Sequence, residues 1–248
     1  MGTAGIPDRQ DAPELWVCQL GEVPYLQALE LQRALRTARQ EERIPDVLLL
    51  LEHPPVYTRG RRTAPGDMTV SEQWCADQGI DVVDVDRGGK VTYHGPGQLV
   101  GYPVMRTESV RGHVHAMERA MVAALADEGV AARTRPDDGP DYTGVWVGDA
   151  KIGAIGVHVQ RRVTTHGFAI NVDNDLGPFG WVVACGLPEV STTSVAQVTG
   201  RTDDVIRCLR KRVAWRFAIA TGRRQRLVSE TRLREAIDRT PARATINA

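Results

Sequence analysis

The chain has 248 residues, which is the length of one large domain or at most two small ones. Apolar residues make up 42% of it and charged residues 25%, which excludes a chain that is disordered throughout. The 31 basic residues balance the 31 acidic ones. This zero net charge excludes a protein that binds nucleic acid or another polyanion through its overall charge. Only Lys90, Lys151 and Lys211 are lysines, and lysine is the cation whose pKa a protein can tune for catalysis.

The ends of the chain and its cysteines bear on compartment and boundaries. No early apolar run resembles a signal peptide and none approaches the ~20 residues of a membrane span, so we expect a cytoplasmic protein with free thiols and no membrane contact. We predict a flexible lead-in over 1–13, one domain over 14–222 and an arginine-rich tail over 223–248. Disorder is expected in the tail, which holds one short helix near Glu230–Arg239.

The first predicted elements alternate between strand and helix. A strand over Glu14–Leu20 precedes a helix over Pro24–Glu42, because proline is tolerated in a first helical turn. The continuous apolar run Asp46–Leu51 predicts a buried central strand. A short helix follows over Val70–Gln78, with Ser71 as its N-cap.

The middle of the chain predicts two strands around a glycine-rich turn and then a helix. The strands cover Asp81–Val85 and Gln98–Val104. The helix covers Arg111–Glu128 and ends at Gly129, since glycine is the usual residue just beyond a helix C-terminus.

Three strands and a last helix complete the domain. The strands cover Thr143–Val147, Lys151–Gln160 and Val163–Val172, and their two-residue connections favour antiparallel pairs. Thr202–Ala220 is helical, with apolar residues at steps of four. Hairpins mixed with helices predict an α+β (α/β) fold, with a mostly antiparallel or mixed sheet flanked by helices.

The densest group of chemically useful residues is the segment RGGKVTYHGPGQ, Arg87–Gln98. Its four glycines let the backbone approach a ligand closely and present N–H groups to it. The segment contains neither the GxGxxG fingerprint of dinucleotide sites nor the GxxxxGK[ST] phosphate loop. The structural alternative is a flexible connection, but such connections rarely contain Arg, Thr, Tyr and His among their glycines.

Two strands and one loop add candidates. KIGAIGVH, beginning at Lys151, has small residues at alternating positions that leave room for a ligand, although Lys151 alone fits a solvated strand end. THGFAIN places His166 beside a glycine, although His166 alone fits a structural histidine. Cys185 lies in the loop ACGLP, whereas Cys18, Cys75 and Cys208 lie in predicted strands and helices, where core packing is their expected role. If one cysteine is reactive, it is Cys185.

Together these segments resemble the lipoyl(octanoyl) transferases of the biotin/lipoate protein ligase superfamily. The resemblance rests on RGGKVTYHGPGQLVGYPV, KIGAIGVHV, THGFAINV and ACGL, with EHPPVYTRGR (Glu52–Arg61) as a further match, and it covers roughly Glu14–Ala220. Ala184 departs from the proline that this family commonly has before its cysteine, and the chain beyond Gly222 has no clear counterpart. The resemblance implies a fold like that of biotin and lipoate protein ligases and of class II synthetases.

The resemblance also implies an activity. An octanoyl group would pass from octanoyl-acyl carrier protein to a lysine of a lipoyl domain through a cysteine thioester, as the first step of endogenous protein lipoylation. The implied acceptors are lipoyl domains of 2-oxoacid dehydrogenase subunits and the glycine cleavage H protein. A monomer is expected, without metal, cofactor or nucleic acid.

The family's site residues carry over by position. The implied nucleophile is Cys185 and its partner is Lys151. The implied acyl pocket consists of Arg87, Gly88, Gly89, Lys90, Val91, Thr92, Tyr93, His94, Ala154, Ile155, Gly156, Gly167, Phe168 and Ala169. An ammonium beside a thiol favours the thiolate over its ordinary pKa of about 8.5, and a lysine, unlike an arginine, can both donate and accept a proton. Because the donor is already a thioester, no ATP is required.

Other functions remain open at this point. An ATP-dependent lipoate or biotin ligase on the same fold would hold an acyl-adenylate and need no cysteine. A non-catalytic domain would bind acidic partners through the arginine-rich end, where residues 201–248 carry a net charge of +8 and the first 200 residues −8. A hydrolase would pair Cys185 with His94 or His166. For the transferase, Arg59, Arg61 and Arg62 are the candidates for docking an acidic carrier.

Overall fold

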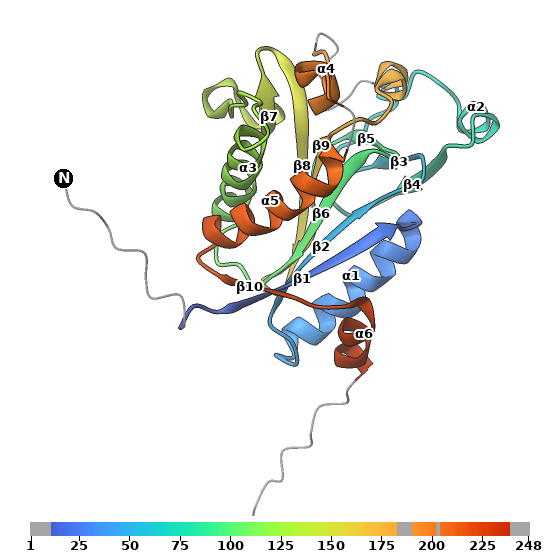
Figure 1. The fold of residues 1–248 in the computed structure, drawn as a ribbon. Helices are drawn as coiled ribbons and strands as arrows, with labels where there is room; N and C mark the ends of the chain where they lie inside the picture. The colour runs from blue at the N-terminus through green and yellow to red at the C-terminus, as the bar shows by residue number, and fades with distance from the viewer. Residues whose placement is uncertain (1–10, 183–189, 202–203, 239–248) are drawn as a thin grey trace, which may run out of the picture.

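The computed structural model describes residues 11–182, 190–201 and 204–238, and Figure 1 shows how they are arranged around two β-sheets. The larger sheet has the strand order β10-β1-β2-β6-β9-β8-β7. Its strands are β1 (Glu14–Glu22), β2 (Asp46–Glu52), β6 (Gln98–Val104), β7 (Gly144–Val147), β8 (Ala150–Gln160), β9 (Val163–Asn171) and β10 (Arg224–Leu227). The β10–β1 and β1–β2 pairs are parallel and the other pairs antiparallel, so the sheet is mixed, as predicted.

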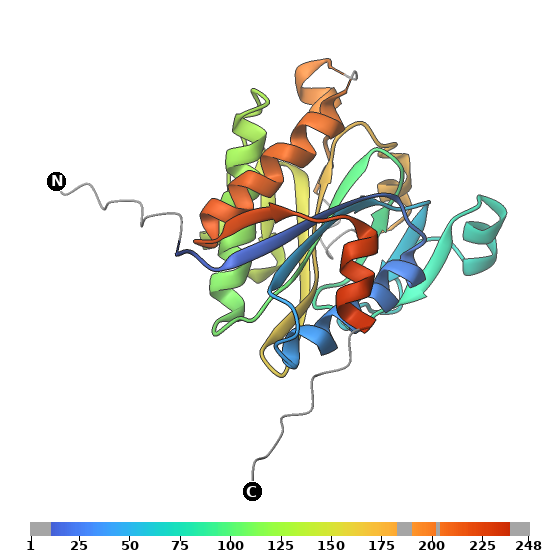
Figure 2. The same ribbon diagram turned by 60° about the horizontal axis from the view of Figure 1, so that its bottom comes forward.

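Helices cover both faces of the larger sheet (Figures 1 and 2). They are α3 (Val110–Ala126) and α5 (Val205–Ala220) on one face, and α1 (Tyr25–Gln40) and α6 (Glu230–Asp238) on the other. Leu48 and Leu50 of β2 pack toward α3 and α5, while Leu49 and Leu51 pack toward α1 and α6. β2 is therefore buried on both faces, as its continuous apolar run requires, and the prediction of a central strand is confirmed.

A smaller sheet lies beside the larger one, in the order β4-β3-β5. Its strands are β3 (Val56–Arg59), β4 (Asp81–Asp84) and β5 (Val91–His94). β5 lies inside the glycine-rich segment that the sequence predicts as a turn, so that segment is a loop followed by a short strand. The helix α2 (Glu72–Asp77) begins as predicted, with the hydroxyl of Ser71 accepting the N–H of Trp74.

The turns of the larger sheet follow the predicted pattern. Arg161 and Arg162 have φ of +47° and +64°, the left-handed conformation that a two-residue hairpin turn requires between β8 and β9. The left-handed Gly129 follows α3, as predicted. The short helix α4 (Val195–Thr199), capped by Ser194, was not predicted. No helix within the described ranges combines the length and hydropathy that a membrane crossing requires.

The described part of the predicted tail is folded: α6 confirms the short helix predicted near Glu230–Arg239, whereas the strand β10 was not expected in a disordered tail. β10 pairs in parallel with β1, from Glu14 opposite Arg224 to Val17 opposite Leu227. Leu233 of α6 is fully buried against the face of the sheet that α1 covers, and Figure 2 shows α6 on the same face as α1. The larger sheet therefore extends past the predicted boundary at 222. The predicted lead-in, apart from residues 11–13, and the last ten residues of the chain lie outside the described residues.

Candidate active site

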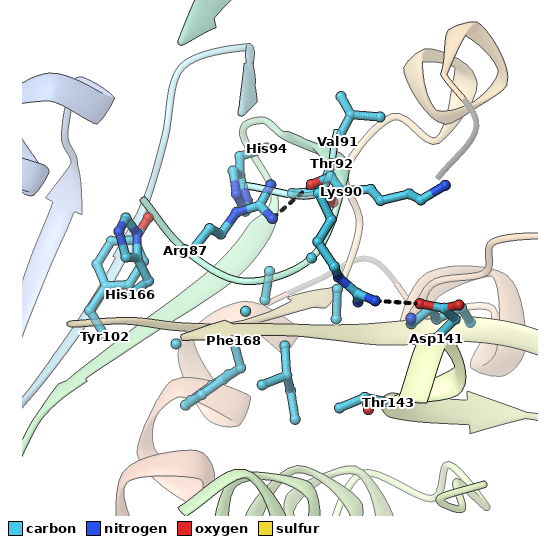
Figure 3. Close-up of a pocket in the computed structure, with 18 of the residues that line it drawn as sticks. Arg87, Lys90, Val91, Thr92, His94, Tyr102, Asp141, Thr143, His166 and Phe168 are labelled. Atoms are coloured by element: carbon cyan, nitrogen blue, oxygen red, sulfur yellow. Dashed lines mark hydrogen bonds and ion pairs between the residues drawn. The ribbon is translucent and has the colours of Figure 1, made fainter. Parts of the chain in front are cut away.

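A pocket of about 650 Å³, partly open to solvent, lies between β5 with its preceding loop and the strands β8 and β9 (Figure 3). The register of β8 and β9 places Ala154 opposite Ala169 and Gly156 opposite Gly167, so the two predicted strand segments form one wall. The predicted residues that line the pocket are Arg87, Gly89, Lys90, Val91, Thr92, His94, Ala154, Ile155, Gly156, Gly167, Phe168 and Ala169. The fold thus gathers three distant segments around one cavity.

Two residues of the predicted acyl pocket, Gly88 and Tyr93, are not part of this lining. The ring of Tyr93 packs 5.4 Å from that of Tyr57 and 5.6 Å from that of Phe179, in the core of the smaller sheet. The N–H of Gly88 donates to the carbonyl of Val157 over 2.9 Å, which attaches the loop to β8. Both residues hold the loop and β5 in position from outside the pocket.

Arg87 lines the pocket, but its guanidinium is bound to the protein itself. Nη2 donates to the carbonyl and the hydroxyl of Thr58, both at 2.7 Å, and Nη1 donates to the carbonyl of Lys90 at 2.7 Å. The close packing requires glycines, because a Cβ on Gly60 would lie 2.6 Å from Nη1 and one on Gly156 would lie 2.9 Å from the Cδ of Arg87. The glycines of this region therefore serve close contact between strands and loop.

Lys151 lies where the pocket meets a second pocket of about 400 Å³, and it lines both. Its side chain is buried, with Nζ 5.1 Å from the centre of the Trp146 ring, within the range of a cation–π contact. Gly144 has a φ of +136°, and a Cβ there would lie 2.8 Å from the Cε of Lys151 and would overlap the carbonyl oxygen of Gly153. Gly144 thus makes room for the stem of this lysine.

The predicted nucleophile Cys185 lies outside the described residues, in the gap 183–189. The segment that follows the gap is paired with β8 at Lys151. The N–H of Lys151 donates to the carbonyl of Ser191 over 2.9 Å, and its own carbonyl accepts the N–H of Thr193 over 3.0 Å. Val190 lines the second pocket together with Lys151. The chain after Cys185 is therefore bonded to the backbone of its predicted partner.

Several lining residues were not among the predicted pocket residues: Tyr25, Tyr102, Pro140, Asp141, Thr143 and His166. Arg62, predicted only as a docking residue, also lines the pocket. Tyr102 lies inside the longest matching motif, and His166 was weighed as a structural histidine. Tyr25 lies on α1 and carries no signal in the sequence. Figure 3 shows His166 and Tyr102 at one end of the pocket and Asp141 and Thr143 at the other.

His94 and its neighbour His53 are uncharged near neutral pH. Burial lowers the pKa of His94 to about 3 and that of His53 to about 4. His94 Nδ1 donates to the amide oxygen of Gln98 over 2.7 Å, because the amide nitrogen of Gln98 donates elsewhere. The hydroxyl of Tyr102 donates to His53 Nε2 over 2.7 Å, and His53 Nδ1 donates to the carbonyl of Val23.

The three arginines predicted to dock an acidic partner differ in their ion pairs. Arg59 forms ion pairs with Asp84, at 2.7 Å, and with Glu72, so its charge is already compensated. Arg62 lies at the pocket and forms an ion pair of 3.1 Å with Asp141. Arg61 is exposed to solvent.

Comparison with known proteins gives consistent results. The family model of the lipoyl protein ligase A/B catalytic domain matches residues 24–214. The octanoyltransferase of Caldicellulosiruptor bescii is 44% identical over 197 residues, which cover 77% of this chain and 86% of that protein. The octanoyltransferase of Caldicellulosiruptor saccharolyticus is 40% identical over 232 residues, which cover 90% of this chain and 96% of that protein.

Solved structures share the fold. Lipoate-protein ligase A bound with ATP superposes with a TM-score of 0.70 at 18% identity, covering 92% of this chain and 95% of that chain. A structure from the lipoylation system of Thermoplasma acidophilum, described as a bipartite lipoate protein ligase and its E2 lipoyl domain, gives a TM-score of 0.67 at 18% identity, covering 92% of this chain and 93% of that chain. At this identity the likeness shows the fold alone, and it confirms the predicted architecture.

Proposed function

The chain belongs to the lipoyl protein ligase A/B catalytic-domain family, and from this premise and its octanoyltransferase relatives we propose that it is an acyltransferase that moves octanoyl groups in protein lipoylation. The donor is octanoyl-acyl carrier protein, and the acceptor is a lysine of a lipoyl domain. The acceptor proteins are the lipoyl-domain subunits of 2-oxoacid dehydrogenases and the glycine cleavage H protein.

The reaction has two steps. The thiolate of Cys185 attacks the carbonyl carbon of the donor thioester, so a new thioester forms on the enzyme while the carrier's thiolate leaves. The amine of the acceptor lysine then attacks the enzyme thioester, an amide forms, and the Cys185 thiolate is released. Lys151 donates a proton to the leaving carrier thiolate and later takes one from the attacking amine, so the protons balance without ATP.

The position of Lys151 carries this proposal. It is buried where two pockets meet, and the chain that follows Cys185 is hydrogen-bonded to its backbone. One pocket suits the acyl chain, because Ile155, Phe168 and Ala169 give it an apolar wall. Each buried methylene contributes about 0.8 kcal/mol, so an octanoyl chain would gain roughly 5–6 kcal/mol before ordering costs.

The proposed partners and compartment agree with the surface and the cysteines. Acyl carrier proteins and lipoyl domains are generally acidic. Arg62 lines the pocket and forms one ion pair, with Asp141, and its chain neighbour Arg61 is exposed to solvent. Cys18, Cys75 and Cys208 are free thiols, as expected in the reducing cytoplasm. We expect the enzyme to act there as a monomer.

Intact mass spectrometry tests the proposal directly. Incubation of the protein with octanoyl-acyl carrier protein, without ATP, should add one octanoyl group that hydroxylamine removes, as a thioester requires. Cys185→Ala and Cys185→Ser should lose the adduct, whereas the control Cys208→Ser should keep it. An adduct that persists in the Cys185 variants would refute the nucleophile.

The same incubation separates the transferase from a ligase. The fold is shared with lipoate-protein ligase A bound with ATP, but the similarity at 18% identity extends to the fold alone. A ligase would transfer nothing from the carrier and would depend on ATP and a free acid. Octanoyl transfer to a lipoyl domain in the absence of ATP is the outcome that we expect, and absolute ATP dependence would overturn it.

A further inference from the structure

The end of the pocket remote from Lys151 is closed by ring side chains. Lys151 and Gly156 both line the pocket and lie five residues apart on β8. Gly156 pairs with Gly167, and the next pair along the strands is Val157 with His166. In Figure 3, His166 and Tyr102 lie at the end of the cavity opposite Asp141 and Thr143. An acyl chain whose carbonyl lies beside Lys151 points toward them.

His166 adopts a backbone conformation that side chains rarely take. Its φ is +58°, in the middle of strand β9, and such strain in a non-glycine residue persists only where the surroundings enforce it. Its N–H leaves the sheet and donates to the amide oxygen of Gln32 on α1, over 2.7 Å. Gln32 is fully buried. The turned backbone aims the imidazole at the end of the pocket.

Two partners on other elements hold the ring. His166 Nε2 donates to the carboxylate of Asp86 over 2.7 Å, and Nδ1 accepts from the hydroxyl of Tyr25 over 3.3 Å. Burial lowers the pKa of His166, and the bond from His166 holds the pKa of Asp86 well below its ordinary value. The imidazole is thus neutral, and both of its nitrogens are engaged within the protein. A saturated chain end can rest against it without leaving an unmet hydrogen bond.

We propose that the His166 ring, fixed by Gln32, Tyr25 and Asp86, is the stop that sets the length of the acyl chain. This inference rests on the proposed octanoyl transfer, because it concerns the same pocket. A longer chain has to displace a ring that Tyr25 and Asp86 hold and whose backbone Gln32 fixes, in an interior as closely packed as a crystal. A shorter chain leaves the end unfilled and loses about fourfold in binding for each missing methylene. His166 is a specificity residue and takes no part in the bond changes.

The variant His166→Gly tests the stop, because glycine adopts a φ of +58° without strain and removes the ring. Carrier proteins loaded with six-, eight-, ten- and twelve-carbon chains would compete for the full-length enzyme, with the acyl products measured by mass. We expect the wild type to prefer eight carbons to twelve. In His166→Gly the ratio of twelve- to eight-carbon product should rise at least tenfold. His166→Asn, which also tolerates this φ, should give a smaller shift in the same direction.

A buried histidine outside the pocket supplies the control. His113 lies on α3, and His113→Ala should leave the chain-length ratio unchanged, whatever it does to stability. Thermal unfolding establishes which variants are folded, and either His166 variant suffices for the test. An unchanged ratio in a folded His166 variant would overturn the proposal.

Binding without chemistry separates this inference from the proposed function. Alkyl-pantetheine thioethers of eight and twelve carbons cannot transfer their chains, and calorimetry gives their Kd values. The twelve- to eight-carbon affinity ratio should rise in His166→Gly as the product ratio does. If no variant or wild-type protein transfers octanoyl groups but this shift occurs, the proposed function fails and the stop stands. If transfer occurs and neither ratio shifts, only the stop fails.

Discussion

The backbone N–H of Lys151 donates to the carbonyl oxygen of Ser191 over 2.9 Å. The main chain therefore fixes Lys151 to the segment that follows Cys185, and the side chain of Lys151 is not needed for that connection. Substitution of this side chain can change proton transfer while the strand stays in place.

Lys151→Arg should keep the charge and lose most of the turnover. A guanidinium does not deprotonate in proteins, so it cannot take the proton of the acceptor amine, and we expect a loss of at least about 100-fold in kcat. Single-turnover transfer to a lipoyl domain measures this loss. The control Lys211→Arg, on the exposed side of α5, should be unaffected. Near-normal turnover in Lys151→Arg would remove its acid–base role.

Gly144→Ala should reduce both stability and turnover. The new Cβ would meet the carbonyl of Gly153 and the Cε of Lys151, at a φ of +136° that already disfavours alanine. Gly139→Ala is the matched control, because Gly139 has a φ of +99° and no atom within 4 Å of a Cβ. Each variant should lose about 1–3 kcal/mol of unfolding free energy in denaturant titrations. Turnover should fall in Gly144→Ala alone, and equal turnover in the two would contradict this role of Gly144.

Reversing Arg61 and Arg62 to glutamate should weaken docking of the acidic carrier. We expect KM for octanoyl-acyl carrier protein to rise about tenfold at low salt, with a smaller effect at high salt because the charges are screened. A neutral octanoyl thioester should react at a nearly unchanged rate. The same charge change on α6, Arg232→Glu with Arg234→Glu, tests the C-terminal cations separately. An unchanged KM in Arg61→Glu with Arg62→Glu would exclude this surface.

The buried histidines predict acid sensitivity. Burial lowers the pKa of His53 and His113 to about 4 and that of His94 to about 3, whereas an unfolded histidine titrates near 6.5. Between pH 6.5 and about 4 the unfolded chain binds more protons than the folded protein, so the free energy of unfolding falls as the pH falls. His113→Met should reduce that slope by up to about 1.4 kcal/mol per pH unit in denaturant titrations. Above pH 7 both proteins should show no slope from this source. An identical slope below pH 6.5 would contradict the prediction.

Long periodic or continuous apolar segments predicted the fold well. The central strand at Asp46–Leu51 and the hairpin at Arg161–Arg162 follow from hydrophobic burial on two faces and from turn length, which are local properties. β10 was missed because its sequence, RQRL, is polar and exposed, and only its pairing with β1 defines it as a strand. Pairing between residues 210 positions apart leaves no local pattern.

The site was predicted in outline, because the matching motifs contain most of its lining. Tyr93 was predicted to line the pocket, but it lies on β5, where successive side chains point to opposite faces. The motif alone does not show that this segment is a strand. Arg59 was predicted as a docking residue, but its charge is compensated by Asp84. Because Asp84 lies on a neighbouring strand, the sequence does not show this ion pair. The ring of His166 is held by Asp86 and Tyr25, which lie 80 and 141 residues away in the sequence. No single segment of the sequence could therefore predict these contacts.

The short strand β10 affects how readily the protein aggregates. Because β10 is the outermost strand of the larger sheet, it covers part of the backbone edge of β1 that would otherwise offer unpaired N–H and C=O groups. Its own side chains include Arg224 and Arg226, and charged residues on an edge strand discourage pairing with another chain. Removal of the residues after Gly222 would expose the edge of β1 and the apolar surface that α6 covers. Such a shortened chain would therefore be prone to aggregation even with every residue of the pocket present.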